Sequence, residues 1–322
     1  MQCIRAFFHA EGFVEVETPV RLKIPCMELH IDAEPSGDHY LRTSPELFHK
    51  KLIAQGADKI FEIGKCFRQG ERGNLHNPEY TMLEWYRTGG DYMTALADTQ
   101  KLLESISAGS LGSRTSATDC RTGAKTPPIP FVGGVPEGLG GFPNAWKQLR
   151  CVSALRVAEN SPLSKPWKIF TISEVFEEFA GWNPVEDLDA DRFDFDLVEK
   201  VEPALPKDCP VVLKDYPAEL CALARFKPGN PKVAERWELY LGGVEIANAY
   251  SELTDPVEQR RRFEHWGEQR RALGKTVYPI DLEFIDCLER MPPTCGVALG
   301  VDRLLMSLFG EDSLDAVLPF RD

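Results

Sequence analysis

Residues 67–86 read FRQGERGNLHNPEYTMLEWY, and the segments on both sides of the central loop alternate in polarity with a period of two. Such alternation is typical of β-strands, whose successive side chains point to opposite faces of a sheet. It directs Arg68 and Glu84 toward one cleft, while Trp85 points to the other side. The pattern therefore predicts an antiparallel hairpin with a charged, aromatic face. The alternative is a half-solvated sheet with both charges at the surface.

A second informative segment is GVALGVDR at residues 296–303, a strand of small residues that leads into the apolar residues 304–309. The apolar residues predict a helix, with Asp302 as its N-terminal cap. Arg303 then lies in the first turn. Because a helix N-terminus attracts anions, an arginine there is suited to bind a phosphate group.

Two more segments place polar side chains on regular elements. Residues 236–252 read RWELYLGGVEIANAYSE, which predicts two strands joined by a turn at Gly242 and Gly243. Residues 43–47 read TSPEL and lead into a predicted helix with Pro45 at its first position. Because several segments place polar side chains on regular elements, the alternative that Arg68 and Glu84 are isolated surface charges is disfavoured.

The ordered motifs resemble those of the class II aminoacyl-tRNA synthetases, in the branch specific for lysine, aspartate and asparagine. Residues 12–19 (GFVEVETP) are similar to the first signature motif of the family, residues 67–86 to the second and residues 296–303 to the third. The resemblance spans nearly the whole chain. It implies an α+β fold, with a mainly antiparallel sheet flanked by helices, and a homodimer formed through the first motif.

Within this branch the chain is most similar to lysyl-tRNA synthetase paralogues that attach β-lysine to elongation factor P. Residues 84–86 (EWY), 248–252 (NAYSE) and 296–303 carry this closer resemblance. It implies that the chain activates a lysine-type amino acid with ATP as an adenylate. The aminoacyl group is then transferred to a lysine side chain of elongation factor P.

Length and composition fit one catalytic domain with insertions. The chain has 322 residues, of which 43% are hydrophobic, enough for a sizeable core. It has no apolar run long enough to span a membrane and no signal sequence at its start, which favours the cytoplasm. Nine cysteines without a CxxC pair disfavour a zinc ribbon and favour reduced thiols. We expect Cys66 and Cys295 to be small buried side chains.

The net charge of −13 disfavours a protein that binds nucleic acid over a broadly basic surface. A local basic cluster at residues 260–262 and 270–271 lies on a predicted helix rich in glutamate, where a solvated charged face is the favoured interpretation. The first motif begins within the opening helix, residues 3–10. We therefore expect no anticodon-binding barrel and no stable tRNA complex, and Met1 is either the true start or an internal methionine.

Composition divides the chain into a core with motifs 1 and 2 (residues 1–104), a Gly-, Ser- and Pro-rich insertion (105–166), a small helical insertion (167–207) and a core with the metal hairpin and motif 3 (208–322). The Gly-, Ser- and Pro-rich composition favours a flexible insertion over a lid on the active site. The helical insertion should contain an amphipathic helix at Ile172–Phe179 and an acidic, turn-rich run at residues 187–196.

The formation of an adenylate requires positive charge. An amino-acid carboxylate attacks the α-phosphate of ATP while both are anionic, so arginines suit the site. The resemblance assigns Arg68 to the carboxylate and α-phosphate, and Arg303 to the γ-phosphate, as the catalytic pair. It assigns Glu238 and Glu245 to Mg²⁺, which bridges the phosphates. Strict alternation would put Glu245 on the opposite face from Asn248, Tyr250 and Glu252. If all four serve one site, a β-bulge or break near Ala247 is required, and we expect one.

The resemblance also implies contacts between ATP and the second motif, where Tyr80 is expected to stack on adenine. The chain departs from the family pattern here, because Gly70 stands where the usual glutamate would be and Glu71 comes one position later. Either Glu71, after a shift of the loop, or Gln69 with backbone groups then contacts adenine. The expected nucleotide-binding residues are Arg68, Gln69, Glu71, His76, Asn77, Tyr80, Glu245, Ile246, Gly300 and Arg303.

The expected substrate is cationic, because several carboxylates fall near the same cleft. An ammonium group is costly to bury unless a carboxylate compensates it. The resemblance assigns Glu84, Glu252 and Tyr86 to the distal ammonium of a lysine. It assigns Ser44 and Glu46 to the nearer amine. The expected substrate-binding residues are Ser44, Pro45, Glu46, Glu84, Tyr86, Asn248, Tyr250, Glu252 and Ala298.

Ala298 bears on which isomer of lysine is used. By resemblance, a lysyl-tRNA synthetase has glycine at this place, and the added methyl group narrows the pocket beside the α-carbon of the substrate. A methyl group in a tight pocket changes selectivity by roughly 10–200-fold. An amine one carbon further along, as in β-lysine, relieves the clash. The alternative is that Ala298 only packs the strand.

Two other functions fit parts of the sequence. A catalytically silent paralogue would bind lysine or a protein partner as a regulator, and a minimal enzyme of this class would acylate tRNA or another RNA. The joint presence of Arg68 and Arg303 disfavours the first, and the acidic net charge disfavours the second. A ligase that makes a free amide such as asparagine would need a pocket for an acidic substrate, which the glutamates disfavour.

Overall fold

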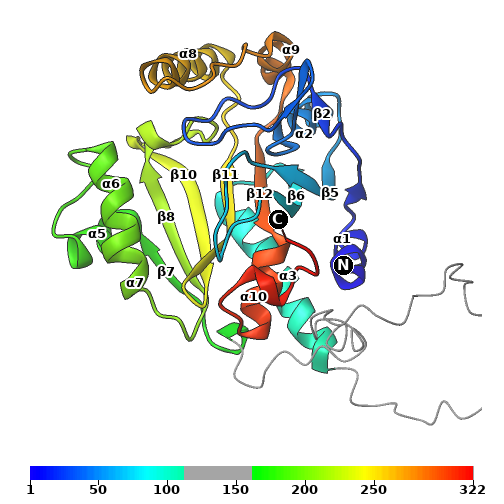
Figure 1. Cartoon of the computed structure of the whole chain (residues 1–322), viewed down its shortest axis with the longest axis vertical. Coiled ribbons are helices and arrows are strands. Elements are labelled where there is room, and N and C mark those ends of the chain that lie inside the picture. The colour runs from blue at the N-terminus through cyan, green and yellow to red at the C-terminus, as the bar shows by residue number, and fades with distance from the viewer. Residues whose placement is uncertain (112–161, 322) are drawn as a thin grey trace, which may run out of the picture.

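The centre of the fold is a sheet whose strands come from both ends of the chain (Figure 1). The computed structural model describes residues 1–111 and 162–321. Within them the sheet has nine strands in the order β1-β5-β6-β12-β11-β10-β8-β7, with β9 paired to β10. The strands are β1 (Val14–Glu15), β5 (Lys59–Phe67), β6 (Glu79–Thr88), β7 (Lys168–Thr171), β8 (Val211–Pro217), β9 (Phe226–Lys227), β10 (Asn230–Leu241), β11 (Val244–Ser251) and β12 (Thr294–Gly300).

Most strand pairs in the described residues are antiparallel, and only β1 with β5 and β7 with β8 are parallel. Helices lie on both faces of the sheet, which confirms the predicted α+β class (Figure 1). A small second sheet has the order β2-β4-β3, from β2 (Arg21–Leu22), β3 (Pro35–Ser36) and β4 (His39–Leu41). The helices are α1 (Gln2–Ala10), α2 (Glu46–Ala54), α3 (Tyr92–Leu111), α5 (Ile172–Phe179), α6 (Ala190–Asp196), α7 (Glu202–Ala204), α8 (Pro256–Ala272), α9 (Leu282–Cys287) and α10 (Val301–Phe309).

The predicted hairpin is formed by β5 and β6, which pair with Glu62 opposite Glu84 and Phe61 opposite Trp85. Phe61 and Trp85 are buried in the hydrophobic core on one face of the sheet. Glu62 and Glu84 point to the other face, where they are 4% and 1% exposed. The antiparallel hairpin is therefore confirmed, and the alternative of a half-solvated sheet is wrong, because the charged face is covered by other elements.

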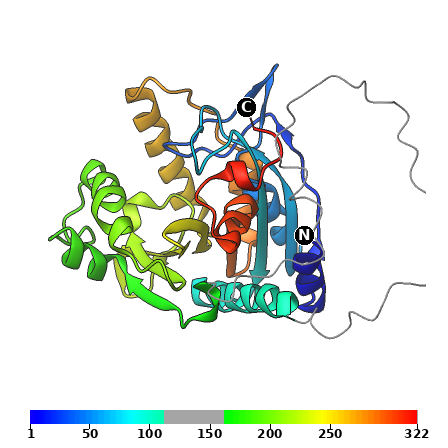
Figure 2. The ribbon, with the colours of Figure 1, turned by 60° about the horizontal axis from the view of Figure 1, so that its bottom comes forward.

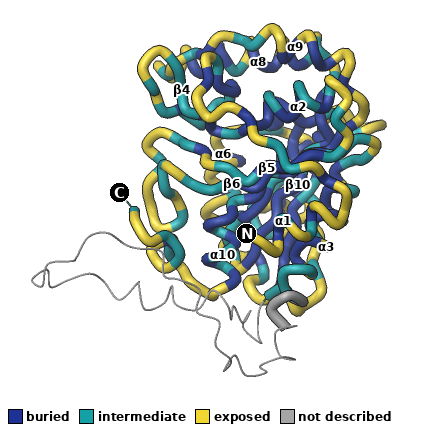
Figure 3. Tube along the Cα trace, turned by 90° about the vertical axis from the view of Figure 1, so that its right-hand side faces the viewer, coloured by how far each residue is buried: buried dark blue, intermediate teal, exposed yellow. Residues whose placement is uncertain are grey.

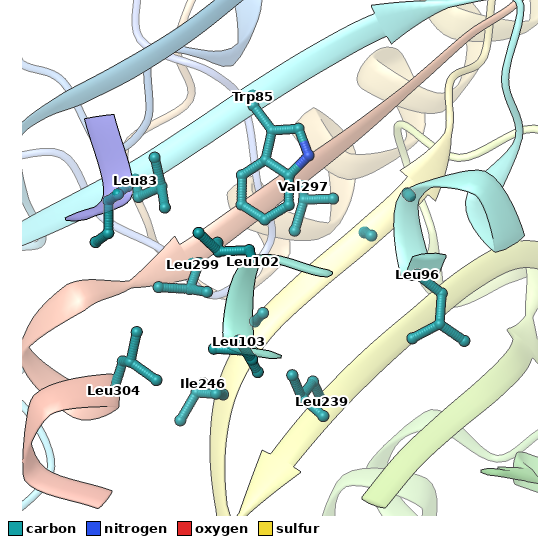
Figure 4. Close-up of a cluster of buried hydrophobic side chains, with 14 of the residues drawn as sticks. Leu83, Trp85, Leu96, Leu102, Leu103, Leu239, Ile246, Val297, Leu299 and Leu304 are labelled. Carbon is teal, nitrogen blue, oxygen red and sulfur yellow. The ribbon is translucent and has the colours of Figure 1, made fainter. Parts of the chain in front are cut away.

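One face of the sheet packs against α1, α3 and α10. Figure 4 shows the centre of this core, where Trp85, Val297 and Leu299 of the strands lie near Leu102 and Leu103 of α3. Figure 2 shows α3 along the lower side of the sheet with α1 at its end. Because this face is filled with apolar side chains, any polar site must lie on the opposite face.

The opposite face is partly covered by α2, α8 and α9, which form a second hydrophobic cluster with Ile60 and Tyr86. Figure 3 shows these helices at one end of the molecule, with the central strands largely buried beneath them. Polar side chains gather at the start of β6, at the start of β11 and around the end of β12. They line a pocket on that face.

The helical insertion lies beside β7 and β8 at one end of the sheet (Figure 1). Its helix α5 spans Ile172–Phe179 as predicted, and Thr171 and Glu174 form a capping box at its start. The expected turn-rich run at 187–196 is wrong in part, because Asp189 caps a helix, α6, over Ala190–Asp196. Residues 112–161 of the expected flexible insertion lie outside the described residues, so the choice between a flexible segment and a lid stays a prediction.

The basic cluster on α8 differs from the predicted solvated face. Arg262 is 6% exposed and Arg270 is 0% exposed. Arg262 donates to the carbonyl of Ala224 at 2.7 Å, and Arg270 donates to the carbonyl of Glu28 at 2.7 Å. These partners are remote in sequence, so the local glutamates did not reveal them. Arg261 and Arg262 also both pair with a helix neighbour, Glu258, each at 2.7 Å.

Two further expectations concern the whole chain. Cys66 and Cys295 are buried free thiols, as predicted. Burial raises the pKa of each thiol to about 12, so both stay protonated. Within residues 1–111 and 162–321, every helix is too short or too polar to cross a membrane.

Candidate active site

A pocket lies between the β5–β6 hairpin, strands β11 and β12, and the start of α10. These elements come from the two outer parts of the sequence, which the sheet brings together. The pocket contains most of the residues that the sequence analysis proposed. They are Ser44, Glu46, Arg68, Glu71, His76, Asn77, Tyr80, Glu84, Tyr86, Glu245, Ile246, Asn248, Tyr250, Ala298, Gly300 and Arg303.

Four proposed residues do not line the pocket: Pro45, Gln69, Glu238 and Glu252. Pro45 precedes α2 as its N-cap instead of occupying its first position. Gln69 is exposed, and its backbone N–H donates to the Asp32 carbonyl at 2.8 Å. Glu238 forms an ion pair with Arg236 and accepts hydrogen bonds from two tyrosine hydroxyls.

The Glu252 carboxylate lies next to Gly296, which lines the pocket. A Cβ atom added to Gly296 would lie 2.5 Å from Glu252 Oε1 and 2.4 Å from the Tyr86 ring. The absence of a side chain at Gly296 therefore lets both groups approach the strand. Glu252 therefore lies on the same face of β12 as Tyr86, which lines the pocket.

Arg303 lies in the first turn of α10, as predicted, and is held by the loop of the second motif and by β11. Its guanidinium donates to the carbonyl of Leu75 at 3.1 Å and to the carboxylate of Glu245 at 3.1 Å. It also lies 2.7 Å from Nε2 of His76. Burial and the charge of Arg303 lower the pKa of His76, so the imidazole is neutral and accepts this hydrogen bond. The arginine is thus oriented before any phosphate arrives.

Asp302 has a different role from the predicted one. It is the second residue of α10 and makes no capping hydrogen bond, because Gly300 occupies the N-cap position. Its carboxylate accepts from the backbone N–H of Thr81 at 2.7 Å. Asp302 therefore joins the helix to β6 and fixes the position of its neighbour Arg303.

Arg68 follows the end of β5 and enters the pocket beside Tyr80, with its guanidinium carbon 5.3 Å from the centre of the ring. Its Nη1 lies 3.7 Å from a carboxylate oxygen of Glu71. Its Nε is buried and has no hydrogen-bond partner within the described part of the chain. A buried donor without a partner is costly, so this atom is suited to receive an oxygen of a ligand.

The backbone conformation of the loop in the second motif explains why Gly70 stands where the family usually has glutamate. Gly70 has a φ of +77°, a conformation that side chains other than glycine rarely adopt. The turn it makes carries Glu71 into the pocket, while Gln69 stays outside it. Of the two alternatives for the adenine contact, the geometry therefore favours Glu71.

The expected β-bulge is present between β10 and β11. Leu239 pairs with Ala247, whereas the next residue, Tyr240, pairs with Glu245, so Ile246 is the extra residue. The bulge puts Glu245 on the same side as Asn248, and both line the pocket. The prediction of a break in the ladder near Ala247 is confirmed.

Glu84 is fully enclosed at the base of the pocket. Ser44 Oγ donates to its Oε2 at 2.8 Å, and the Tyr86 hydroxyl donates to its Oε1 at 2.9 Å. Burial, together with the charge of Glu46, raises the pKa of Glu84 to about 8. A cation that entered beside Glu84 would stabilise its ionised form, so the geometry suits an ammonium group.

Lys50 is the most important residue that the sequence analysis missed. It is completely buried, and its Nζ lies 2.6 Å from Glu46 Oε1 and 2.6 Å from Glu252 Oε2. Burial opposes the charge of Lys50, but the two carboxylates outweigh burial and raise its pKa. Two of the acids assigned to the substrate thus already share an internal ammonium. The spacing of Glu46 and Lys50, four residues apart on one helix, is the signal that could have revealed the pair.

Other lining residues also went unpredicted. Most come from irregular segments or from strand positions with small or apolar side chains, and Asp302 comes from the first turn of α10. They are Glu28, Leu75, Thr81, Met82, Ala247, Gly296, Val297, Asp302 and Leu314.

The residues present can hold Mg²⁺ together with a triphosphate. Glu245 faces the pocket, and burial and the charge of Glu238 raise its pKa, so a cation nearby would be favourable. Among the residues that the structure describes, no group of three or more His, Cys, Asp or Glu side chains forms a complete metal site. Mg²⁺ that is bound by phosphates requires only one or two carboxylates from the protein.

Comparisons with known proteins agree with this geometry. The chain matches the family described as tRNA synthetases class II (D, K and N) over residues 1–322. It is 32% identical over 338 residues to the elongation factor P–(R)-β-lysine ligase of Vibrio cholerae serotype O1, covering 98% of this chain and 91% of the relative. Proteins with the same name from Photorhabdus laumondii and Proteus mirabilis are each 34% identical, with the same coverage. The chain is therefore similar along nearly its whole length to proteins of this name.

Proposed function

The chain belongs to the class II tRNA synthetases of the D, K and N type, and from this membership we propose that it activates (R)-β-lysine with ATP and joins it to a lysine side chain of elongation factor P. The observation that carries the proposal is one pocket in which Arg68 and Arg303 accompany the buried carboxylate of Glu84. The arginines suit two anionic reactants, and the carboxylate suits a cationic side chain.

Activation joins the amino acid to the α-phosphate of ATP. A carboxylate oxygen of the amino acid forms a bond to the α-phosphorus, while the bond from that phosphorus to the bridging oxygen of the β-phosphate breaks and pyrophosphate leaves. Arg68 binds the carboxylate and the α-phosphate, and Arg303, at the start of α10, binds the terminal phosphate. Glu245 and Glu238 would hold Mg²⁺, which would neutralise charge on the phosphates.

Transfer uses the lysine amine of elongation factor P. The neutral amine attacks the carbonyl carbon of the adenylate, the carbon–oxygen bond to the phosphate breaks, and AMP leaves. Loss of a proton from the nitrogen completes the amide.

The substrate lies between the two arginines and the base of the pocket. Glu84 and Tyr86 bind the distal ammonium group, as the resemblance implies. Lys50 pairs with one carboxylate oxygen of Glu46. The other oxygen of Glu46 binds the nearer amine of the substrate. Tyr80 and Glu71 then line the place for adenine, beside Arg68.

Mass spectrometry tests the proposed reaction. Elongation factor P is incubated with the enzyme, ATP and either β-lysine or α-lysine, and a gain of one lysyl residue is expected with β-lysine. A parallel reaction in which tRNA replaces elongation factor P tests the alternative that the enzyme acylates RNA. Absence of modification with both isomers, or acylation of tRNA alone, would contradict the proposal. Failure to exchange pyrophosphate into ATP would instead favour a regulatory lysine-binding protein.

We also propose that the protein is a cytoplasmic homodimer. Strand β1, from the first motif, lies at the edge of the sheet, where Val14 is 61% exposed. An exposed edge strand with an apolar side chain suits a contact with a second copy. Light scattering that shows a monomer at micromolar concentration would contradict the dimer.

Replacing Ala298 with glycine is expected to improve the use of α-lysine relative to β-lysine by about 10-fold or more. Ala298 lies on β12 between Glu84 and Asn248, where its methyl group narrows the pocket. The measurement is kcat/KM for each isomer in ATP–pyrophosphate exchange. Ala249→Gly is the matched control, because Ala249 is a strand residue that faces the hydrophobic core. An unchanged ratio of the isomers in Ala298→Gly would mean that Ala298 only packs the strand.

Substrate use is expected to depend on pH through Glu84. Because its pKa is raised to about 8, the carboxyl is mostly neutral below that pH and binds an ammonium weakly. The apparent affinity falls with the ionised fraction, so kcat/KM for β-lysine should fall about tenfold per unit as the pH drops below 8. The check is a pH profile of the exchange reaction between pH 6 and 9. A profile with the same slope in Glu84→Gln would show that another group is responsible.

A further inference from the structure

Glu28 differs from the other acidic residues of the pocket in that its side chain has no partner within residues 1–111 and 162–321. Six acidic side chains line the pocket, and five of them are bound within the described residues. The bound ones are Glu46 with Lys50, Glu71 with Arg68, Glu84 with Ser44 and Tyr86, Glu245 with Arg303, and Asp302 with the backbone of Thr81. For Glu28 there is no side-chain hydrogen bond or ion pair to any described residue, so its carboxylate is available to a ligand.

The backbone around Glu28 is held in place by α8. Arg270, which is 0% exposed, donates to the carbonyls of Glu28 at 2.7 Å and Ile31 at 3.0 Å, and also binds the carboxylate of Asp32. The carbonyl of Asp32 accepts from the backbone N–H of Gln69 at 2.8 Å, which ties the segment to the second motif. The Glu28 side chain therefore enters the pocket from a fixed backbone.

The balance of charges in the pocket favours a further carboxylate, that of Glu28, beside the second ammonium group of the substrate. A diamino acid such as β-lysine carries two ammonium groups, and Glu84 compensates the distal one. Glu46 and Glu252 share the ammonium of Lys50, which offsets one of their two negative charges, so Glu46 offers the second ammonium less than a full carboxylate charge. The second ammonium lies near the reacting carboxylate of the amino acid, hence on the Arg68 side of the pocket, and Glu28 interacts electrostatically with Arg68.

We propose that Glu28 is a substrate-binding residue that acts beside Glu46 and selects for the second amine of the substrate, the one nearer to its reacting carboxylate. This inference rests on the proposed function and names a residue in the same pocket. Burial raises the pKa of Glu28 to about 7, partly offset by Arg68, so a substrate ammonium readily stabilises its ionised form. A charged hydrogen bond of this kind contributes about 1.5–3 kcal/mol, which corresponds to roughly 10–150-fold in affinity.

The test compares two ligands that differ in one amine. β-Lysine carries both amines, whereas 6-aminohexanoate keeps the distal amine and lacks the second one. In Glu28→Gln, the KM for β-lysine in ATP–pyrophosphate exchange is expected to rise about 10-fold or more, with kcat changed far less. The inhibition constant of 6-aminohexanoate against β-lysine should stay within about twofold of the native value, because that ligand offers nothing for Glu28 to bind.

Control variants separate this role from a structural one. Glu34→Gln changes a nearby acid outside the pocket and should leave both constants unchanged. Glu28→Asp keeps the charge and should recover part of the affinity for β-lysine. Equal effects of Glu28→Gln on both ligands, or no effect on β-lysine, would overturn the inference while leaving the proposed function intact. A native enzyme that activates neither lysine isomer would overturn both.

Discussion

Replacing Arg68 with lysine is expected to lower β-lysine-dependent ATP–pyrophosphate exchange by about 100- to 1,000-fold, the effect of removing one preorganised donor to a developing negative charge. Lysine keeps the positive charge but loses the planar, two-pronged donor set that can hold the carboxylate and the α-phosphate together. The unpaired, buried Nε of Arg68 marks the donor that would be lost. The measurement is kcat for exchange at saturating ATP and β-lysine.

Arg72→Lys is the matched control, because Arg72 is an exposed arginine of the same loop that does not line the pocket. Its exchange rate should stay close to that of the native protein. If Arg68→Lys also exchanges pyrophosphate within about threefold of the native rate, Arg68 is not the residue that joins the two reactants.

Replacing Lys50 with methionine is expected to destabilise the fold by about 3–5 kcal/mol, the usual cost of removing one partner of a buried ion pair. The loss would leave Glu46 and Glu252 close together, buried and without a cation. Urea unfolding at pH 7, with free energies extrapolated to water, measures the effect. The double variant Lys50→Met, Glu252→Gln should recover part of the stability, because it removes one of the two buried acids.

Lys65→Met provides the comparison at the surface. Lys65 lies 3.2 Å from Glu79, but the two side chains are 48% and 54% exposed, so the pair should contribute less than about 1 kcal/mol. Equal stability losses for Lys50→Met and Lys65→Met would show that the buried ammonium is not needed to hold the acids together.

The parts of the fold that could be predicted are those with a local signal. Alternation of period two identified the β5–β6 and β10–β11 hairpins, and an apolar run identified α10. The assumption that Glu245 and the polar residues after it serve one site predicted a bulge or break near Ala247, and the bulge is at Ile246. Each inference needed only neighbouring residues.

The parts that could not be predicted depend on contacts between distant segments. Arg270 looked like a surface charge because its partners, the carbonyls near Glu28, lie at the other end of the sequence. Glu238 was assigned to Mg²⁺, but in the fold it is bound by Tyr216 of a different strand as well as by Arg236 and Tyr240 of its own strand. Glu28 itself stands in a segment without periodicity. Whether a carboxylate can bind a substrate depends on how far it is buried and on which groups already bind it. The tertiary structure determines both.

The position of β12 has a consequence for how the protein is made. This strand is the last of the sheet to leave the ribosome, yet it lies between β6 and β11 and pairs with both. Until it is synthesised, both neighbours present open edges that can recruit strands from other chains. Its pairing with β6 also joins residues separated by most of the sequence, which slows closure. Nascent or truncated chains that end before Thr294 should therefore depend on chaperones and aggregate without them.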